Sequence, residues 1–326
     1  MTRQQPLIPR FYCDWVNWLI QMGKMAASDL TISGLSMATG SSVIEMFDNK
    51  PHNLQTITAF PSISTQFIIQ INTNIVGTSQ DINFLSILGH NFLDADVKFS
   101  LWRAGPGWSN PTQVQLTEVI NLGTNASQTW TADNNGWTLA TFTTLDVNND
   151  EYRLVIDAAA SNYDADIKIG SIQLGKYIDP PTRPNIELPL DLEFRNKIDE
   201  TDGGQAFSNM QFDSAPDWYL APYEVGTGST GTVIKRAGRY VQNWVWSMLP
   251  DSNLIPADFQ TEANLLTGNT MWNILQYTRG SHFPCLIQLD NTSTNEWLWA
   301  RIYDQSPALQ TSPNVYTINW NIREEF

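Results

Sequence analysis

Apolar and polar residues largely alternate in short stretches over the first half of the chain, a pattern typical of half-buried β-strands. Residues 67–71 (FIIQI) and 97–101 (VKFSL) are examples. Turn-forming residues separate such stretches, as at 105–107 (GPG) and 133–136 (DNNG). The pattern predicts strands at 43–47, 65–72, 82–88, 96–102, 113–120, 137–143, 151–157 and 166–174. Strands at this spacing are typical of a jelly-roll sandwich, which we expect over residues 35–178.

Three prolines within residues 180–184 interrupt this pattern. Proline lacks a backbone donor and stiffens the chain, so we expect no strand to continue through it. We therefore predict a linker at 179–185 and a second domain at 186–326. The strands expected in that domain are 240–248, 283–289, 296–303 and 314–322.

The second domain also contains a pattern typical of helices. Pro256 begins a first helical piece, which Gly268 ends. A second piece runs over 270–277 and ends at Gly280. The fold predicted for the whole chain is mainly β, with two β-sandwich (jelly-roll-like) domains, the second carrying a short helical insertion.

Residues 199–231 are polar and rich in glycine. They are expected to form long surface loops or an extended hairpin that makes contacts, and a mobile linker is the alternative.

Residues 1–34 form a separate aromatic segment, predicted to be either an arm or a first strand. Phe11, Trp15, Trp18 and Met22 have helical spacing, but no clean alternation or helix is defined. An arm would insert Trp15 and Trp18 into a neighbouring subunit, because aromatic anchors dominate interface energies. The alternative is that the segment packs on its own domain.

Composition and charge narrow the function classes. Charged residues make up 16%, below the roughly 25% of typical globular proteins, and Asn, Thr, Ser and Gln fill the polar positions. Such a profile is typical of an extracellular or virion β-protein. The net charge of −15 disfavours binding to nucleic acid and to anionic membranes.

Two further segments bear on the location of the protein. No stretch approaches the roughly 20 apolar residues that cross a bilayer. Asp14, Asn17 and Gln21 interrupt the apolar N-terminus, and no small-residue cleavage site follows, so no signal peptide is predicted. We expect synthesis in a host cytoplasm and, if the protein reaches the outside of a cell, release within a particle rather than secretion.

The common catalytic and metal-binding motifs are absent. The sequence has no GxSxG, HExxH or P-loop, so we predict no enzyme and no cofactor. The two cysteines, Cys13 and Cys285, and the three histidines form no ligand pairs, so no metal site is predicted. The cysteines are expected to be free, buried thiols, although a disulfide is left open.

Two other features are interpreted as structural. His90 is expected at a turn, with its imidazole bonded to a loop rather than serving as a base. Residues 146–150, with Asp157 at the twelfth position, resemble the start of a calcium loop. Glu151 stands where such a loop needs glycine, so a turn between strands is the prediction.

The thirteen tryptophans raise the question of carbohydrate binding. Four of them lie near predicted loops of the first sandwich and are candidates for stacking on sugar rings: Trp102, Trp108, Trp130 and Trp137. Core filling or subunit contacts are the alternative.

Three segments resemble proteins of marine bacteriophage tails. Residues 84–92 (FLSILGHNF) resemble a strand and turn in the galactose-binding-like jelly rolls of phage tail proteins. Residues 169–177 (IGSIQLGKY) are similar to the strand that closes those modules, and 316–326 (YTINWNIREEF) to a terminal strand of the same proteins.

This resemblance implies a virion structural protein of the tail tip or baseplate, without catalytic residues. The implied partners are a tail tube, tail hub or fibres, within a homo-oligomeric ring. Two alternatives remain open: a host-surface carbohydrate-binding module, which would bind a host glycan, and a capsid or neck decoration protein.

Overall fold

The structure is a computed structural model. It describes residues 8–62, 65–73, 81–105, 107–124, 129–133, 135–146, 151–158, 165–185, 190–193, 196–210, 238–256, 268–294 and 296–325. The chain is mainly β, as predicted, with two large antiparallel sheets and a separate hairpin. No helix in these ranges is long and apolar enough to cross a membrane.

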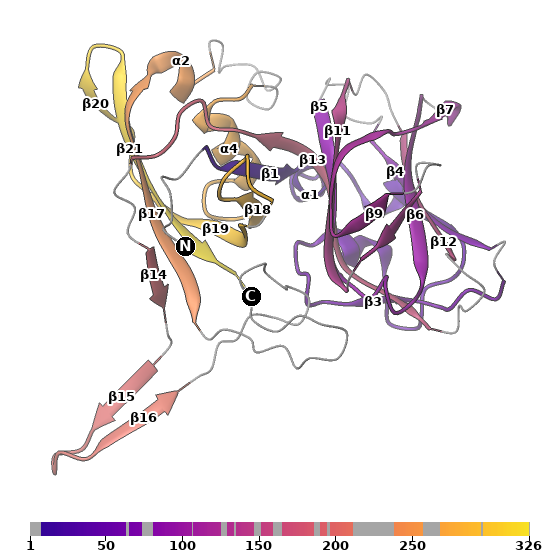
Figure 1. The fold of residues 1–326 in the computed structure, drawn as a ribbon, viewed down its shortest axis with the longest axis horizontal. Coiled ribbons are helices and arrows are strands. Elements are labelled where there is room, and N and C mark those ends of the chain that lie inside the picture. The colour runs from indigo at the N-terminus through magenta and orange to yellow at the C-terminus, as the bar shows by residue number, and fades with distance from the viewer. Residues whose placement is uncertain are drawn as a thin grey trace.

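The first half of the chain is a sandwich of two sheets (Figure 1). Its seven-stranded sheet has the order β2 (Leu30–Gly34), β4 (Gln66–Asn72), β12 (Glu151–Ala158), β6 (Val97–Gly105), β10 (Trp130–Ala132) and β9 (Leu122–Thr124), with β7 (Ser109–Gln113) on β6. Its inner face contributes Phe67, Leu101 and Leu154 to a core shared with Ile87 and Ile172 of the other sheet. Alternation along a strand such as β4 therefore reflects one buried and one outer face, whereas β5 and β13 are buried along most of their length.

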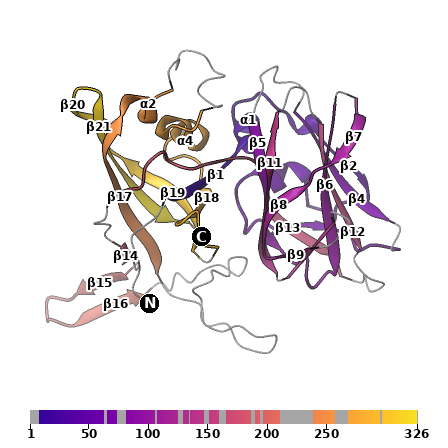
Figure 2. The ribbon, with the colours of Figure 1, turned by 45° about the horizontal axis from the view of Figure 1, so that its top comes forward.

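The second sheet has twelve strands and extends through both halves of the molecule (Figure 2). Its order is β14 (Leu190–Glu193), β17 (Arg239–Pro250), β21 (Val315–Glu324), β19 (Trp297–Gln305), β18 (Cys285–Gln288), β1 (Arg10–Asp14), β13 (Ile167–Ile178), β5 (Asp81–His90), β11 (Gly136–Asp146) and β8 (Leu116–Ile120). Two short strands lie off this path: β20 (Leu309–Ser312) on β21 and β3 (Gln55–Ile57) on β13.

The N-terminal strand β1 joins the two halves. It pairs with β13 on one side and with β18 on the other. The chain itself leaves β13 at Ile178, and the proline segment runs beside β17, where Asn185 N donates to Val245 O at 2.7 Å. The sheet thus continues through β1 although no strand continues through the prolines. Because β1 pairs with both halves, the division at 179–185 remains a prediction.

The large sheet is strongly bent at this junction. Trp137 of β11 and Trp297 of β19 lie five strands apart in the sheet order, about 24 Å in a flat sheet. Their ring centroids are nevertheless 5.3 Å apart. These two residues belong to a small second core with Tyr12, Phe84 and Leu286. The sheet therefore curves so that strands of the two halves pack against each other.

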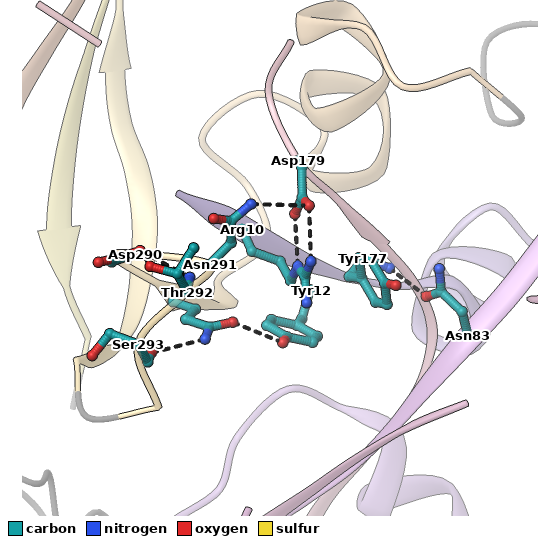
Figure 3. A network of polar contacts seen from close by, with 10 residues as sticks. Arg10, Tyr12, Asn83, Tyr177, Asp179, Asp290, Asn291, Thr292 and Ser293 are labelled. Atoms are coloured by element: carbon teal, nitrogen blue, oxygen red, sulfur yellow. Dashed lines mark hydrogen bonds and ion pairs between the residues drawn. The ribbon is translucent and has the colours of Figure 1, made fainter. Parts of the chain in front are cut away.

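Polar contacts reinforce the junction at β1 (Figure 3). Arg10 donates from Nε and Nη2 to the two carboxylate oxygens of Asp179, at 2.7 and 2.9 Å. Asn291 Nδ2 donates to the same carboxylate at 3.3 Å. The Tyr12 hydroxyl donates to Gln288 Oε1 at 3.1 Å. Strands from the beginning, middle and end of the chain are therefore joined by both ladder and side-chain bonds.

The aromatic N-terminal segment folds onto its own chain. Helix α1 (Trp15–Gln21) follows β1, and its N-cap Asp14 accepts a bond from Val16 N at 3.1 Å. The helix packs against β13 and against α4 (Met271–Thr278) of the other half. The sequence predicted either an arm or a first strand for this segment, and the strand agrees with β1.

Some predicted elements are corrected by the structure. Residues 43–47 form a 3₁₀-helix, η2 (Val43–Phe47), and no strand. Its consecutive residues Met46 and Phe47 are both buried, whereas a strand with one outer face buries only every second side chain. Residues 113–120 are two elements, because the chain crosses from β7 of one sheet to β8 of the other between them.

The helical insertion agrees with the prediction in part. Helix α4 begins at an N-cap, Thr270, whose hydroxyl accepts from Asn273 N, and it ends before Gly280 at φ +66°. A short helix, α2 (Asp251–Leu254), precedes it. Most of the first predicted piece, from Pro256 to Gly268, lies outside the described residues.

Residues 199–231 were expected to form loops or a hairpin. Residues 196–210 form a two-stranded sheet, β15 (Asn196–Glu200) and β16 (Ala206–Met210), which extends away from the rest of the molecule (Figure 1). Residues 211–231 lie outside the described part of the chain.

Candidate functional site

Three neighbouring strands of the seven-stranded sheet place polar and aromatic side chains in one row. In the ladder, Arg153 of β12 lies opposite Gln70 of β4 and opposite Trp102 of β6. Tyr152 and Leu154, on either side of Arg153, are buried in the core. Because side chains alternate along a strand, Arg153 and its two ladder partners lie on the outer face.

A hydrogen-bonded chain fixes Gln70 and Arg153 of this row. Arg153 Nε donates to Gln70 Oε1 at 3.0 Å. Gln70 Nε2 in turn donates to Glu151 Oε2 at 2.8 Å. The other oxygen of Glu151 accepts from the backbone of Gly107 at 2.9 Å. The Glu151 carboxylate therefore ties the turn between β6 and β7 to the face of the sheet.

That turn carries Trp108 onto the guanidinium of Arg153. The Arg153 Cζ lies 3.6 Å from the centroid of the Trp108 ring, a close cation–π contact. Trp108 has φ +59°, in the left-handed region that a bulky residue rarely adopts. Such strain costs on the order of 1–3 kcal/mol and concentrates at functional sites. The turn between β6 and β7 thus fixes the position of the Trp108 ring, and its backbone is strained as a result.

We call these five residues the sheet-face site: Gln70, Trp102, Trp108, Glu151 and Arg153. Trp102 and Trp108 are both partly exposed. The Trp102 indole donates to Ser100 Oγ at 3.0 Å, whereas the Trp108 indole N–H and the two terminal nitrogens of Arg153 have no partner among the described residues. The site offers two aromatic surfaces and free hydrogen-bond donors, which suits a ligand with both apolar and oxygen-rich faces.

The four tryptophans considered for sugar stacking do not lie together. Trp102 and Trp108 belong to the sheet-face site. Trp130 is 3% exposed and packs edge-on against Phe99 inside the sandwich. Trp137 is 1% exposed, in the small core at the junction. The ring faces of Trp130 and Trp137 are therefore covered, and both fill core space as the alternative reading had it.

The two tryptophans considered for a subunit interface are also covered within the chain. Trp15 is 1% exposed and Trp18 6% exposed. The Trp18 indole donates to the carbonyl oxygen of Gln276 in α4 at 3.2 Å. Neither ring is presented to a neighbouring subunit in this conformation.

His90 ends β5 and is buried against Phe92, with ring centroids 4.4 Å apart. Its Nδ1 accepts from Phe92 N at 3.4 Å. Burial lowers the pKa of His90 to about 3, so the imidazole is neutral at physiological pH. The residue is placed as expected, at the end of a strand, and its contacts are those of a core side chain.

The calcium-like segment joins β11 to β12, and its residues 147–150 lie outside the described part of the chain. Within the described ranges, no three His, Cys, Asp or Glu side chains are grouped so that they could hold a metal ion. Cys13 and Cys285 are both free and buried, as expected.

Sequence reasoning missed Gln70, Glu151 and Arg153. The alternation of 151–157 (EYRLVID) does place Glu151 and Arg153 together on the polar face of a strand. The contacts of these residues with Gln70 and Trp108 depend on pairing between strands that are distant in the sequence. The local alternation of apolar and polar residues gives no information on that pairing.

No family model and no curated protein matches the sequence. Among solved structures, the chain is similar to chitosan-binding module 1 of a chitosanase/glucanase from Paenibacillus sp. IK-5, with 16% identity over 45% of this chain and 93% of that one, at a TM-score of 0.32. It is also similar to CBM32-3 from a family 31 glycoside hydrolase of Clostridium perfringens, with 16% identity over 47% and 94% of the chains, at a TM-score of 0.32. A GH29 fucosidase of Ruminococcus gnavus matches over 47% of this chain and 26% of its own length, with 11% identity and a TM-score of 0.30. Similarities this low carry no functional conclusion.

Proposed function

We propose that the protein binds carbohydrate at the sheet-face site. The observation that supports this most is Trp108, held at φ +59° with one ring face on Arg153. An indole fixed in this way binds the apolar face of a sugar ring with little loss of side-chain entropy. The Trp108 ring contacts a partly exposed arginine on the outer face of the sheet, so packing in the core does not account for its position.

The hydrogen-bond donors of the site define the sugar chemistry. The Nε of Arg153 is occupied by Gln70, and its terminal nitrogens have no hydrogen-bond partner among the described residues. Paired guanidinium nitrogens bind carboxylates in bidentate geometry and hydroxyl oxygens singly. The site therefore suits a polysaccharide with an accessible pyranose face, and a carboxylate-bearing sugar would gain an additional ion pair.

Affinity electrophoresis through gels containing neutral or acidic polysaccharides tests this proposal. We expect at least one polysaccharide to retard the wild-type protein. Trp108→Ala removes the stacking surface and is expected to cost about 2 kcal/mol, the scale of a binding hot spot. That loss corresponds to an affinity roughly thirtyfold weaker.

Tyr303→Ala is the matched control for this test. Tyr303 is 55% exposed and lies under Arg323 at 4.9 Å, in the other half of the molecule. It is an aromatic–arginine pair like Trp108 and Arg153 but outside the proposed site, so its variant should be retarded like the wild type. Retardation of no polysaccharide, or equal retardation of Trp108→Ala, would contradict the proposal.

A second candidate function, assembly with other protein chains, is favoured by the hairpin β15–β16. Among the described strands, these two pair only with each other. A two-stranded ribbon is marginally stable in water by itself and has open edges on both sides. A partner chain that covers the hairpin would stabilise it. A ring of this chain in a phage tail, in contact with a tail tube, tail hub or fibres, would use the hairpin in this way, as would a capsid or neck protein.

Replacing residues 196–210 with a short Gly-Ser linker tests the assembly role. The wild-type protein is expected to form oligomers at high concentration, measured by light scattering after size-exclusion chromatography. The hairpin deletion should shift it to a monomer while the β circular-dichroism spectrum is kept. A wild-type monomer at all concentrations, or an unchanged oligomer after deletion, would count against this function.

A further inference from the structure

Cys13 and Cys285 lie on neighbouring antiparallel strands at the junction of the two halves. The ladder between β1 and β18 pairs Arg10 with Gln288, Phe11 with Ile287 and Tyr12 with Leu286. The next step in this register places Cys13 directly opposite Cys285. Opposite residues in an antiparallel pair have Cα atoms about 4.5–5.5 Å apart. This separation is within the roughly 4.4–6.8 Å that a disulfide spans.

The two side chains also point to the same side of the sheet. Cys13 and Cys285 belong to the main core, together with Phe11 and Ile287. The intervening Tyr12 and Leu286 belong instead to the small second core on the other face. The thiols are free and nearly inaccessible, at 1% and 2% exposure of their residues. The strand register and the shared side of the sheet therefore place both sulfur atoms close together in the main core.

We propose that Cys13 and Cys285 are a cross-linking site, at which an oxidised form of the protein carries an intramolecular disulfide between β1 and β18. The bond would join a strand near the start of the chain to a strand of the C-terminal half. Because β1 also pairs with β13, the disulfide fastens the strand that connects both halves of the large sheet.

The oxidant is a small-molecule disulfide such as glutathione disulfide. One cysteine thiolate attacks it, forms a mixed disulfide and releases one glutathione thiolate. The second cysteine thiolate then attacks the protein sulfur of the mixed disulfide and releases the second glutathione, so that two thiols are oxidised and one disulfide is reduced. Burial raises the pKa of Cys285 to about 12 and that of Cys13 well above its ordinary value. The reaction is therefore expected while the chain folds, before β1 is closed in.

Refolding in the presence of glutathione tests the proposal. The full-length protein is denatured, reduced and refolded in oxidised or in reduced glutathione, and the folded fraction is isolated by size and circular dichroism. In oxidised glutathione we expect an intact mass lower by two hydrogens and no titratable thiol in denaturant. A peptide containing Cys13 should be linked to one containing Cys285.

The Cys285→Ala variant provides the control, because it retains Cys13 alone and is expected to show no internal cross-link. A folded wild-type protein that keeps both thiols in oxidised glutathione would overturn the proposal. So would a glutathione adduct on each cysteine, or a cysteine link between two molecules in place of the internal bond.

Discussion

Gly170→Ala is expected to destabilise the protein by about 3 kcal/mol or more, the upper range for overpacking in a core. A Cβ at this position would lie 1.9 Å from the carbonyl oxygen of Pro51 and 2.6 Å from its carbonyl carbon. Both are backbone atoms, so no rotamer change can relieve the contact. The β5–β13 register places Gly170 opposite Gly89, whose own Cβ would lie 2.1 Å from the same oxygen. The Pro51 carbonyl thus packs against two glycines facing each other across the ladder.

Chemical denaturation followed by circular dichroism measures this effect. Gly203→Ala is the control, because the nearest atom to its Cβ would be 3.9 Å away, in ordinary contact. We expect a large loss of stability, or failure to fold, for Gly170→Ala only. Equal midpoints for the two variants would show that the Pro51 segment does not pack on β13 as described.

Asp14→Asn is expected to stabilise the protein increasingly as the pH rises from about 4 to 8. Asp14 is buried, and desolvation raises its pKa from 3.8 to about 7 in the folded state. Its Oδ1 accepts from the backbone of Val16 and of Leu174, but its Oδ2 has no hydrogen-bond partner in the part of the chain that the structure describes. The side chain is thus placed where the neutral form is favoured.

The sign of the pH effect follows from the two pKa values. Between about 4 and 7 the unfolded chain has lost the Asp14 proton while the folded chain keeps it, so this group makes stability fall as the pH rises. The fall approaches roughly 4 kcal/mol above pH 7, at about 1.4 kcal/mol for each pKa unit. Asparagine does not titrate and can accept the same two backbone bonds.

Urea denaturation of the wild type and of Asp14→Asn at several pH values isolates this group, because other carboxylates contribute equally to both proteins. We expect the stability difference in favour of Asn to grow by roughly 3 kcal/mol from pH 4.5 to pH 8. A difference that stays constant over this range would show that Asp14 titrates normally.

Local patterns were enough to predict the longer strands of the sandwich, whereas the short strands β2, β3, β9 and β10 were not predicted. In β12, Tyr152, Leu154 and Ile156 are buried and the residues between them face outward, so alternation identified the strand within a residue of its ends. The same criterion failed at 43–47, where apolar residues form a helical turn against β13. It also failed to divide 113–120, because a change of sheet leaves no mark in the alternation.

Long-range pairing could not be read from the sequence. The central place of β1 depends on its contacts with β13 and β18, whose residues are far along the chain. Its sequence, RFYCD, is short and lies beside helix-forming residues, so neither a strand nor a helix was clearly favoured. The large sheet through both halves was therefore not predicted, although no strand passes through the prolines, as expected.

Of the residues in the candidate site, only the two tryptophans were predicted from the sequence. Trp102 and Trp108 were selected because they lie near a turn, as Trp130 and Trp137 do, and only burial separates the two pairs. Arg153 and Gln70 become part of the site because β4, β12 and β6 are adjacent. The contact between Trp108 and Arg153 depends on the left-handed backbone conformation of Trp108. The residue types at 105–109 (GPGWS) do not by themselves predict that Trp108 adopts it.

The most direct test of carbohydrate binding at the sheet-face site is a titration followed by nitrogen-labelled NMR of the tryptophan indoles. The ligand is the polysaccharide identified by affinity electrophoresis, or an oligosaccharide derived from it. The indole N–H signals of Trp108 and Trp102 are predicted to shift in a saturable way, while those of the buried Trp244 and Trp320 in the other half stay in place. Saturable binding that leaves the Trp108 and Trp102 signals unchanged would contradict the account.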